Sequence, residues 1–120
     1  MSKYVIAHDL GTSGNKATLF DEEGKLIASH VAAYRTDYAA GNRAEQNPDD
    51  WWKAIVETTN ALLQIVSSAD IAGVALSGQM MGCLCIDKKG NPLHSPALLR
   101  PAFAGRRSLP DGEDRSASLL

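Results

Sequence analysis

Apolar and polar positions alternate in a way that predicts three short strands at the start of the chain. These strands are Tyr4–Asp9, Lys16–Asp21 and Leu26–Arg35. Small and hydroxyl residues separate the first two, and Glu22-Glu23-Gly24-Lys25 separates the second from the third, which is a typical hairpin signal. We therefore expect an antiparallel meander, followed by a polar loop over residues 34–46.

One helix is predicted directly after this loop. Asn47 can cap it, Pro48 suits the first helical position, and Asp49 and Asp50 favour the positive end of the helix dipole. Helical spacing of mostly apolar residues predicts one face that packs on the sheet. The residues of this predicted face are Trp52, Ile55, Val56, Thr59, Leu62, Leu63 and Val66.

The nearly continuous apolar segment over residues 71–77 predicts a strand buried on both faces. A strand that follows a helix in this way requires a crossover, so it should lie parallel to its neighbour. The loop Gly78-Gln79-Met80-Met81-Gly82 leaves its carboxyl end, and a further short strand is predicted over Cys83–Asp87. The expected fold class is α/β with the order β-β-β-α-β-β. Ligands of open α/β sheets bind at carboxyl strand ends, which is where two of these loops lie.

The turn Asp9-Leu10-Gly11-Thr12-Ser13-Gly14-Asn15-Lys16 carries the clearest chemical signal. Glycines let a phosphate approach the backbone, Thr12 and Ser13 offer hydroxyl donors, and Asp9 can hold Mg²⁺ through oxygen. The spacing fits neither a P-loop nor a dinucleotide fingerprint, because both of those motifs open a helix. From these residues alone, a phosphate cradle and an ordinary hairpin turn both remain open.

Composition narrows the class of protein. The 120 residues are 44% hydrophobic and 22% charged with a net charge of −2, which is typical of a soluble globular domain. No basic stripe indicates nucleic-acid binding, no apolar run could span a membrane, and the start does not resemble a signal peptide. Cys83 and Cys85 are predicted to be buried small hydrophobes, which together with the missing signal favours the cytoplasm. His8 is predicted to be a structural histidine on the opposite strand face from Asp9.

Four segments together resemble the amino-terminal part of an FGGY-family carbohydrate kinase, closest to xylulose kinases. They occur in the family's order over residues 3–99: the turn at 9–16, Glu45-Gln46-Asn47-Pro48 before Trp51-Trp52, the strand at 71–77, and Gly78-Gln79-Met80. The resemblance implies a ribonuclease-H-like fold shared with actin and hexokinase. It also implies an ATP donor, Mg²⁺, and a sugar or polyol acceptor.

The resemblance assigns roles to individual residues. Gly11, Thr12, Ser13 and Gly14 would hold the ATP phosphates, Lys16 would be the family's basic residue, and Asp9 would lie near the metal. Gln79, Met80 and Met81 would form the sugar-contacting segment. Met81 stands where the family usually has histidine, so a relative acting on another sugar is an alternative, and core packing is an alternative role for Met80 and Met81.

The segment before the helix is interpreted more plainly. Gln46 is interpreted as a solvated loop residue beside the helix cap, and the role of Glu45 stays open. Trp51 and Trp52 are interpreted as packing residues.

The resemblance also divides the chain into 1–99, the amino-terminal part of the first kinase domain, and 100–120, an irregular tail. The tail loses the family's pattern, and we expect it to be disordered, as in a truncated or frameshifted product. The family's catalytic aspartate belongs to a later segment, so no catalytic residue is assigned and the chain alone is expected to be inactive.

Two other functions remain open: a non-catalytic module of the same superfamily that binds phosphate or a partner, and an unrelated small α/β domain. In either kinase-like case, exposed sheet edges would favour self-association.

Overall fold

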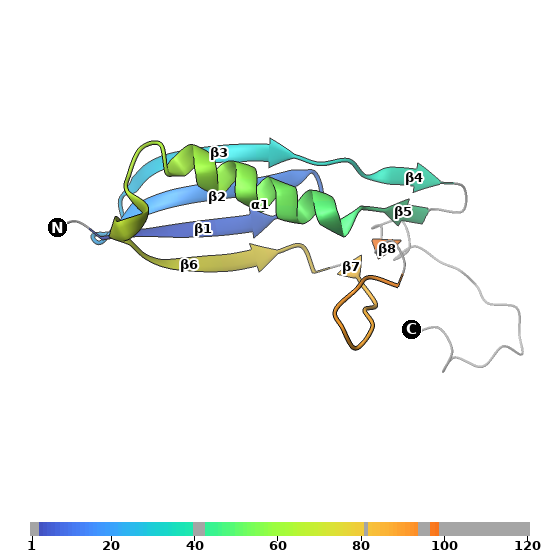
Figure 1. Cartoon of the computed structure of the whole chain (residues 1–120). Coiled ribbons are helices and arrows are strands. Elements are labelled where there is room, and N and C mark those ends of the chain that lie inside the picture. The colour runs from blue at the N-terminus through green and yellow to red at the C-terminus, as the bar shows by residue number, and fades with distance from the viewer. Residues whose placement is uncertain (1–2, 40–42, 81, 94–96, 99–120) are drawn as a thin grey trace, which may run out of the picture.

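The structure, a computed structural model, describes residues 3–39, 43–80, 82–93 and 97–98. Figure 1 shows a sheet of long strands with one helix lying along it. The elements are β1 (Tyr4–Leu10), β2 (Gly14–Asp21), β3 (Leu26–Ala33), β4 (Asp37–Ala39), β5 (Arg43–Glu45), α1 (Pro48–Leu62), the short 3₁₀ helix η1 (Ser68–Asp70), β6 (Ile71–Gly78), β7 (Gly82–Cys83) and β8 (Ala97–Leu98).

The main sheet has the strand order β3-β2-β1-β6. β1, β2 and β3 form the predicted antiparallel meander, and β6 pairs with β1 in parallel after the predicted crossover through α1. The hairpin between β2 and β3 closes at Gly24, whose φ of 81° is the left-handed conformation that glycine adopts without strain. The α/β class and the parallel placement of the last long strand are therefore confirmed.

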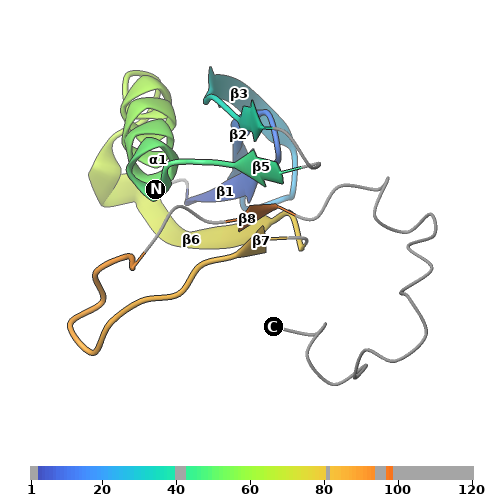
Figure 2. The ribbon, with the colours of Figure 1, turned by 90° about the vertical axis from the view of Figure 1, so that its right-hand side faces the viewer.

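Helix α1 lies against β2 and β3 and reaches β1 on one side of the sheet (Figures 1 and 2). Its start is as predicted: the Asn47 side chain accepts a hydrogen bond from the Asp49 amide, and Pro48 opens the helix. The buried face, however, carries Ala54, Thr58 and Leu62. Trp52 is 66% exposed, so the predicted packing face is rotated from the real one.

The core between helix and sheet is small. Ile6, Ala17, Leu19 and Leu62 are buried together, with half-buried apolar neighbours around them. Alternate residues of β1 and β2 point toward α1, as the two-residue period of a strand requires. Asp9 and Lys16 alternate with these inward-pointing residues, so their side chains lie on the other face of the sheet.

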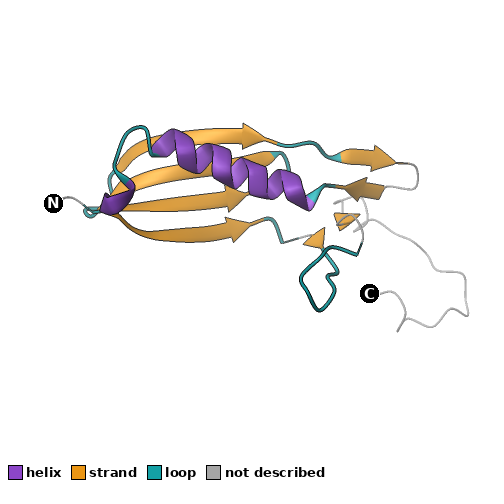
Figure 3. Ribbon diagram, viewed as in Figure 1, coloured by secondary structure: helices purple, strands orange, loops and turns teal. Residues whose placement is uncertain are grey.

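Three further predictions about strands and loops are wrong. The strand β6 is not buried on both faces, since Val74 and Leu76 are 59% and 65% exposed. Helix α1 packs mainly on the other three strands, and of β6 only the first residue, Ile71, packs against the core. The loop over 34–46 contains the β4–β5 hairpin, which joins β7 and β8 in a second small sheet (Figure 3).

The third wrong feature is the strand over 83–87. β7 ends at Cys83, and only an isolated bridge between Ile86 and Pro92 follows. Cys83 and Cys85 are exposed rather than buried. The predicted tail at 100–120 lies outside the described residues.

Candidate nucleotide and sugar site

The turn between β1 and β2 keeps the predicted strand-turn-strand form. The two strands pair without a register shift up to Leu10 opposite Asn15. The Gly11 amide closes the turn by donating to the carbonyls of Asp9 at 3.1 Å and Gly14 at 2.9 Å. Gly14 is needed here for a packing reason, because a Cβ built on it would lie 2.6 Å from the Ala32 carbonyl oxygen of β3.

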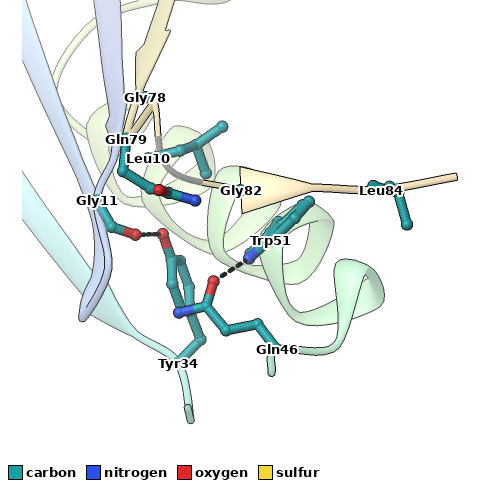
Figure 4. Close-up of a pocket in the computed structure, with 9 residues that line it drawn as sticks. All are labelled: Leu10, Gly11, Tyr34, Gln46, Trp51, Gly78, Gln79, Gly82 and Leu84. Carbon is teal, nitrogen blue, oxygen red and sulfur yellow. Dashed lines mark hydrogen bonds between the residues drawn. The ribbon is translucent and has the colours of Figure 1, made fainter. Parts of the chain in front are cut away.

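The carbonyls of Gly11, Thr12 and Ser13 each accept a hydrogen bond from a residue between β3 and α1. The Tyr34 hydroxyl donates to the Gly11 carbonyl (Figure 4), and the Tyr34 amide donates to the Ser13 carbonyl at 3.2 Å. The Thr12 carbonyl accepts from Gln46 Nε2 at 2.6 Å and from the Thr36 hydroxyl at 3.2 Å. The turn carbonyls are therefore occupied by donors from one side.

The amide groups of the same turn are in the opposite situation. Within the described ranges, the N–H groups and hydroxyls of Thr12 and Ser13 have no hydrogen-bond partner, and both residues are exposed. Adjacent free amides with carbonyls turned away form the kind of concavity that binds anions. The geometry can thus accept phosphate oxygens at this turn.

Gln46 is the residue that the sequence interpretation placed wrongly. It is 3% exposed, and its side chain also donates to Thr36 Oγ1 at 2.8 Å while its oxygen accepts from Trp51 Nε1 at 2.9 Å (Figure 4). A glutamine directly before a helix cap is typical of a solvated loop. Its burial could not be predicted locally, because its partner Thr12 lies 34 residues earlier in the chain. Tyr34, Thr36 and the indole of Trp51 were missed for the same reason. Glu45, whose role was open, is half-buried in β5.

Asp9 and Lys16 face each other across the β1–β2 pair, and both side chains are exposed. The Ser77 hydroxyl of β6 donates to Asp9 Oδ1 at 3.5 Å. Burial, followed by the negative charge of Asp9, raises the pKa of Tyr34, so the phenol keeps its proton as a donor to the turn. A carboxylate, a cation and free amides thus surround one turn.

The donor set around Asp9 suits Mg²⁺ only as a nucleotide-bound ion. Among the described residues, no three His, Cys, Asp or Glu side chains gather into a metal cluster. Mg²⁺ typically uses one or two carboxylates plus substrate phosphates and waters. Asp9, one exposed carboxylate beside the β1–β2 turn, fits that requirement.

The loop after β6 reaches the same turn. Gly78 lies opposite Leu10 in the parallel register, and the Gln79 amide donates to the Leu10 carbonyl at 2.8 Å. A cavity of about 250 Å³ lies between the two segments (Figure 4). It is lined by Leu10, Gly11, Tyr34, Gln46, Trp51, Gly78, Gln79, Gly82 and Leu84.

The three residues of the predicted sugar segment therefore have different positions. Gln79 lines the cavity, whereas Met80 is 92% exposed and does not, so core packing is not its role. Met81 lies outside the described residues. The two loops at carboxyl strand ends nevertheless meet, as the topology led us to expect.

A buried polar network supports the turn from the helix side. His8 is 2% exposed, and its Nδ1 accepts from Asn15 Nδ2 at 2.9 Å, while its Nε2 lies 3.3 Å from the Thr59 hydroxyl. Asn15 Nδ2 also donates to Thr58 Oγ1 at 3.0 Å. Burial lowers the pKa of His8, in keeping with a neutral ring. The prediction of a structural histidine is confirmed.

Comparison with known proteins places this geometry in a family. Residues 4–100 match the model of the N-terminal domain of the FGGY family of carbohydrate kinases. A xylulose kinase from Staphylococcus xylosus is 34% identical over 96 residues, and a glycerol kinase from Caldanaerobacter subterraneus is 31% identical over 117 residues. The alignments cover 80% and 95% of this chain, but only 20% and 23% of those enzymes.

Solved structures agree with this assignment. The gluconate kinase from Lactobacillus acidophilus superposes with a TM-score of 0.75 at 28% identity, covering 81% of this chain and 20% of that one. The predicted ribonuclease-H-like fold, of the actin and hexokinase type, is thereby confirmed. The chain spans about a fifth of the length of the relatives it matches. Because the family model matches residues 4–100, the chain belongs to the FGGY family of carbohydrate kinases.

Proposed function

We propose that this chain supplies the phosphate-binding turn and one wall of the sugar site in an ATP-dependent sugar kinase. Such an enzyme transfers the γ-phosphoryl group of ATP to a hydroxyl of xylulose or a related ketose or polyol. The observation that carries the proposal is the meeting of the β1–β2 turn with Gln79 at one cavity. Donor and acceptor must lie side by side for phosphoryl transfer, which depends mostly on positioning and charge neutralisation.

The residues around the turn have different roles in binding ATP. The amides and hydroxyls of Thr12 and Ser13 donate to phosphate oxygens, and Gly11 and Gly14 shape the turn that presents them. Lys16 contributes positive charge, and Asp9 would hold Mg²⁺, which when bound neutralises phosphate charge. Gln79, with Met80 and Met81 in the same loop, would contact the sugar.

The acceptor is proposed as a class. Matched relatives carry the names xylulose, glycerol and gluconate kinase, whose acceptors share adjacent hydroxyl groups. The amide side chain of Gln79 can both donate to and accept from such hydroxyls. The reaction is proposed to take place in the cytoplasm, where ATP is at hand. As a separate observation, no helix among the described residues is long and apolar enough to cross a membrane.

Calorimetric titration of the chain with ATP, with and without Mg²⁺, tests the proposal. We expect Lys16→Met to weaken binding about tenfold, because a charge-assisted contact to phosphate contributes roughly 1.5–3 kcal/mol. Asp9→Asn should weaken binding only when Mg²⁺ is present.

The matched control is Lys25→Met, which removes the same charge at the exposed β2–β3 hairpin and should change affinity less than about twofold. Equal effects of the two lysine variants, or no binding by the unmodified chain, would contradict the proposal. These 120 residues alone should release no ADP from ATP and xylulose, since they include no assigned catalytic base.

A further inference from the structure

A set of contacts beside the cavity is not explained by the family assignment. Side chains of Tyr34, Thr36 and Gln46 donate to carbonyls of the β1–β2 turn. The Trp51 indole in turn donates to the side-chain oxygen of Gln46. We call these four residues the carbonyl clasp. They come from three places in the chain: Tyr34 and Thr36 follow β3, Gln46 follows β5, and Trp51 lies in the first turns of α1.

We infer that the carbonyl clasp, with Gln46 at its centre, positions the turn so that its amides rather than its carbonyls face the bound phosphate. This inference rests on the proposed function and names positioning residues for it. A peptide unit has its N–H and C=O on opposite sides, so holding a carbonyl on one side directs the following amide to the other. Donors bound to the Gly11 and Thr12 carbonyls thereby direct the Thr12 and Ser13 amides outward.

Gln46 suits this task better than another residue type would. Its amide group donates to the Thr12 carbonyl while its oxygen accepts from the Trp51 indole, so the side chain is held at both ends. At 3% exposure, water cannot easily replace either contact. An anion site gains affinity when its donors are fixed before the ligand arrives.

The variant Gln46→Glu tests the inference while keeping the size of the side chain. A carboxylate can still accept from Trp51, but it cannot donate to the Thr12 carbonyl and repels it instead. The control is Gln64→Glu, the same chemical change on an exposed residue beyond the end of α1. Calorimetry with inorganic tripolyphosphate in Mg²⁺ serves as the binding measurement.

At pH 8 we expect Gln46→Glu to bind tripolyphosphate about tenfold more weakly than Gln64→Glu, the effect of a lost buried hydrogen bond. At pH 5 the difference in affinity between the two variants should fall to about threefold or less. A buried carboxyl has a raised pKa, and its protonated form can donate to the Thr12 carbonyl. The amide NMR signals of Thr12 and Ser13 should move with the same pH dependence.

Trp51→Phe is the second variant, chosen in case Gln46→Glu does not fold. It keeps an aromatic ring, removes the donor to Gln46 Oε1, and should weaken tripolyphosphate binding about threefold.

Equal affinities of Gln46→Glu and Gln64→Glu, with both folded, would overturn the inference. A loss of affinity that does not depend on pH and matches a fall in unfolding temperature would also overturn it, since that is a merely structural role. If the unmodified chain does not bind tripolyphosphate, the proposed function fails first, and the positioning role fails with it.

Discussion

Gly14 shows how a single residue can be required for a reason other than the expected one. The turn motif suggested that its glycines admit a phosphate, yet the structure places β3 backbone against the missing Cβ of Gly14. Ala32 O at 2.6 Å and Ala33 Cα at 2.9 Å leave no room for a methyl group. Among the described residues, the glycines with positive φ are Gly24 and Gly90, both in other turns.

We therefore predict that Gly14→Ala destabilises the chain by about 1–3 kcal/mol, the usual cost of forcing a methylene group into packed backbone. Urea denaturation measures this change. Gly73→Ala is the control, because a Cβ there meets nothing within 4 Å, and it should change stability by less than about 1 kcal/mol. Equal effects of the two substitutions would contradict the packing argument.

For single residues, the sequence predicts interactions with near neighbours in the chain and misses interactions with residues far along it. The Asn47 cap depends on a neighbour two residues away, and it was predicted correctly. Gln46 depends on Thr12, which no local pattern connects to it, and it was interpreted wrongly. The structural role of His8 followed from strand alternation alone, whereas its partners Asn15 and Thr58 did not.

The buried His8 of β1 connects the β1–β2 turn to helix α1 through hydrogen bonds. His8 accepts from Asn15 of β2 and lies beside Thr59 of α1, so its neutral ring joins three elements. Protonation of Nδ1 would place a second donor against the Asn15 amide group. The folded state therefore favours the neutral ring, as the lowered pKa of His8 indicates.

This arrangement predicts how stability depends on pH. Because burial lowers the pKa of His8 in the folded state, the unfolded chain binds the extra proton first, and stability falls as the pH drops below the ordinary histidine pKa of about 6.5. Unfolding free energies from urea denaturation at pH 7.5 and 5.5 measure the loss.

His8→Gln should reduce this pH dependence, whereas His30→Gln, which changes an exposed histidine of β3, should leave it unchanged. A pH dependence that survives His8→Gln would assign the effect to another group.

Element types were predictable where periodicity is long, as in β1 to β3 and α1. The face of α1 was not, because both its apolar and its small residues recur at helical spacing, and Ala54 and Thr58 fit closer to the sheet than Trp52 does. The short β4–β5 hairpin has no alternation long enough to reveal it.

On the scale of the whole molecule, the sheet is covered unevenly. α1 packs mainly on β1, β2 and β3, while β6 forms one edge of the sheet (Figure 2). Val74 and Leu76 of β6 are exposed. β6 carries no charged residue from Ile71 to Gly78. Charged side chains are a common defence against edge pairing, so this strand is open to association.

We predict that the chain self-associates through β6, so that its mean mass in sedimentation velocity rises with concentration. The double variant Val74→Lys with Leu76→Lys should lower the association by adding charge to this edge. Ile27→Lys with Val31→Lys adds the same two charges to exposed positions of β3 and should leave association in place. A constant monomer mass for the unmodified chain would contradict the prediction.

The apolar run of β6 predicts a strand buried on both faces, because most such runs lie in the interior of a sheet. What covers a strand depends on the rest of a molecule, and the pattern within the strand cannot report it. The parallel pairing of β6 with β1, by contrast, followed from the intervening helix and was correct.

The contrast between Trp51 and Trp52 has an optical consequence. The indole of Trp51 lines the cavity and donates to Gln46, whereas the next residue is 66% exposed to solvent. Two adjacent chromophores therefore emit from different surroundings, and a soluble quencher reaches one far more easily than the other. With Trp52 replaced by Phe, the remaining fluorescence would come from the cavity wall, giving the site a reporter that needs no added label.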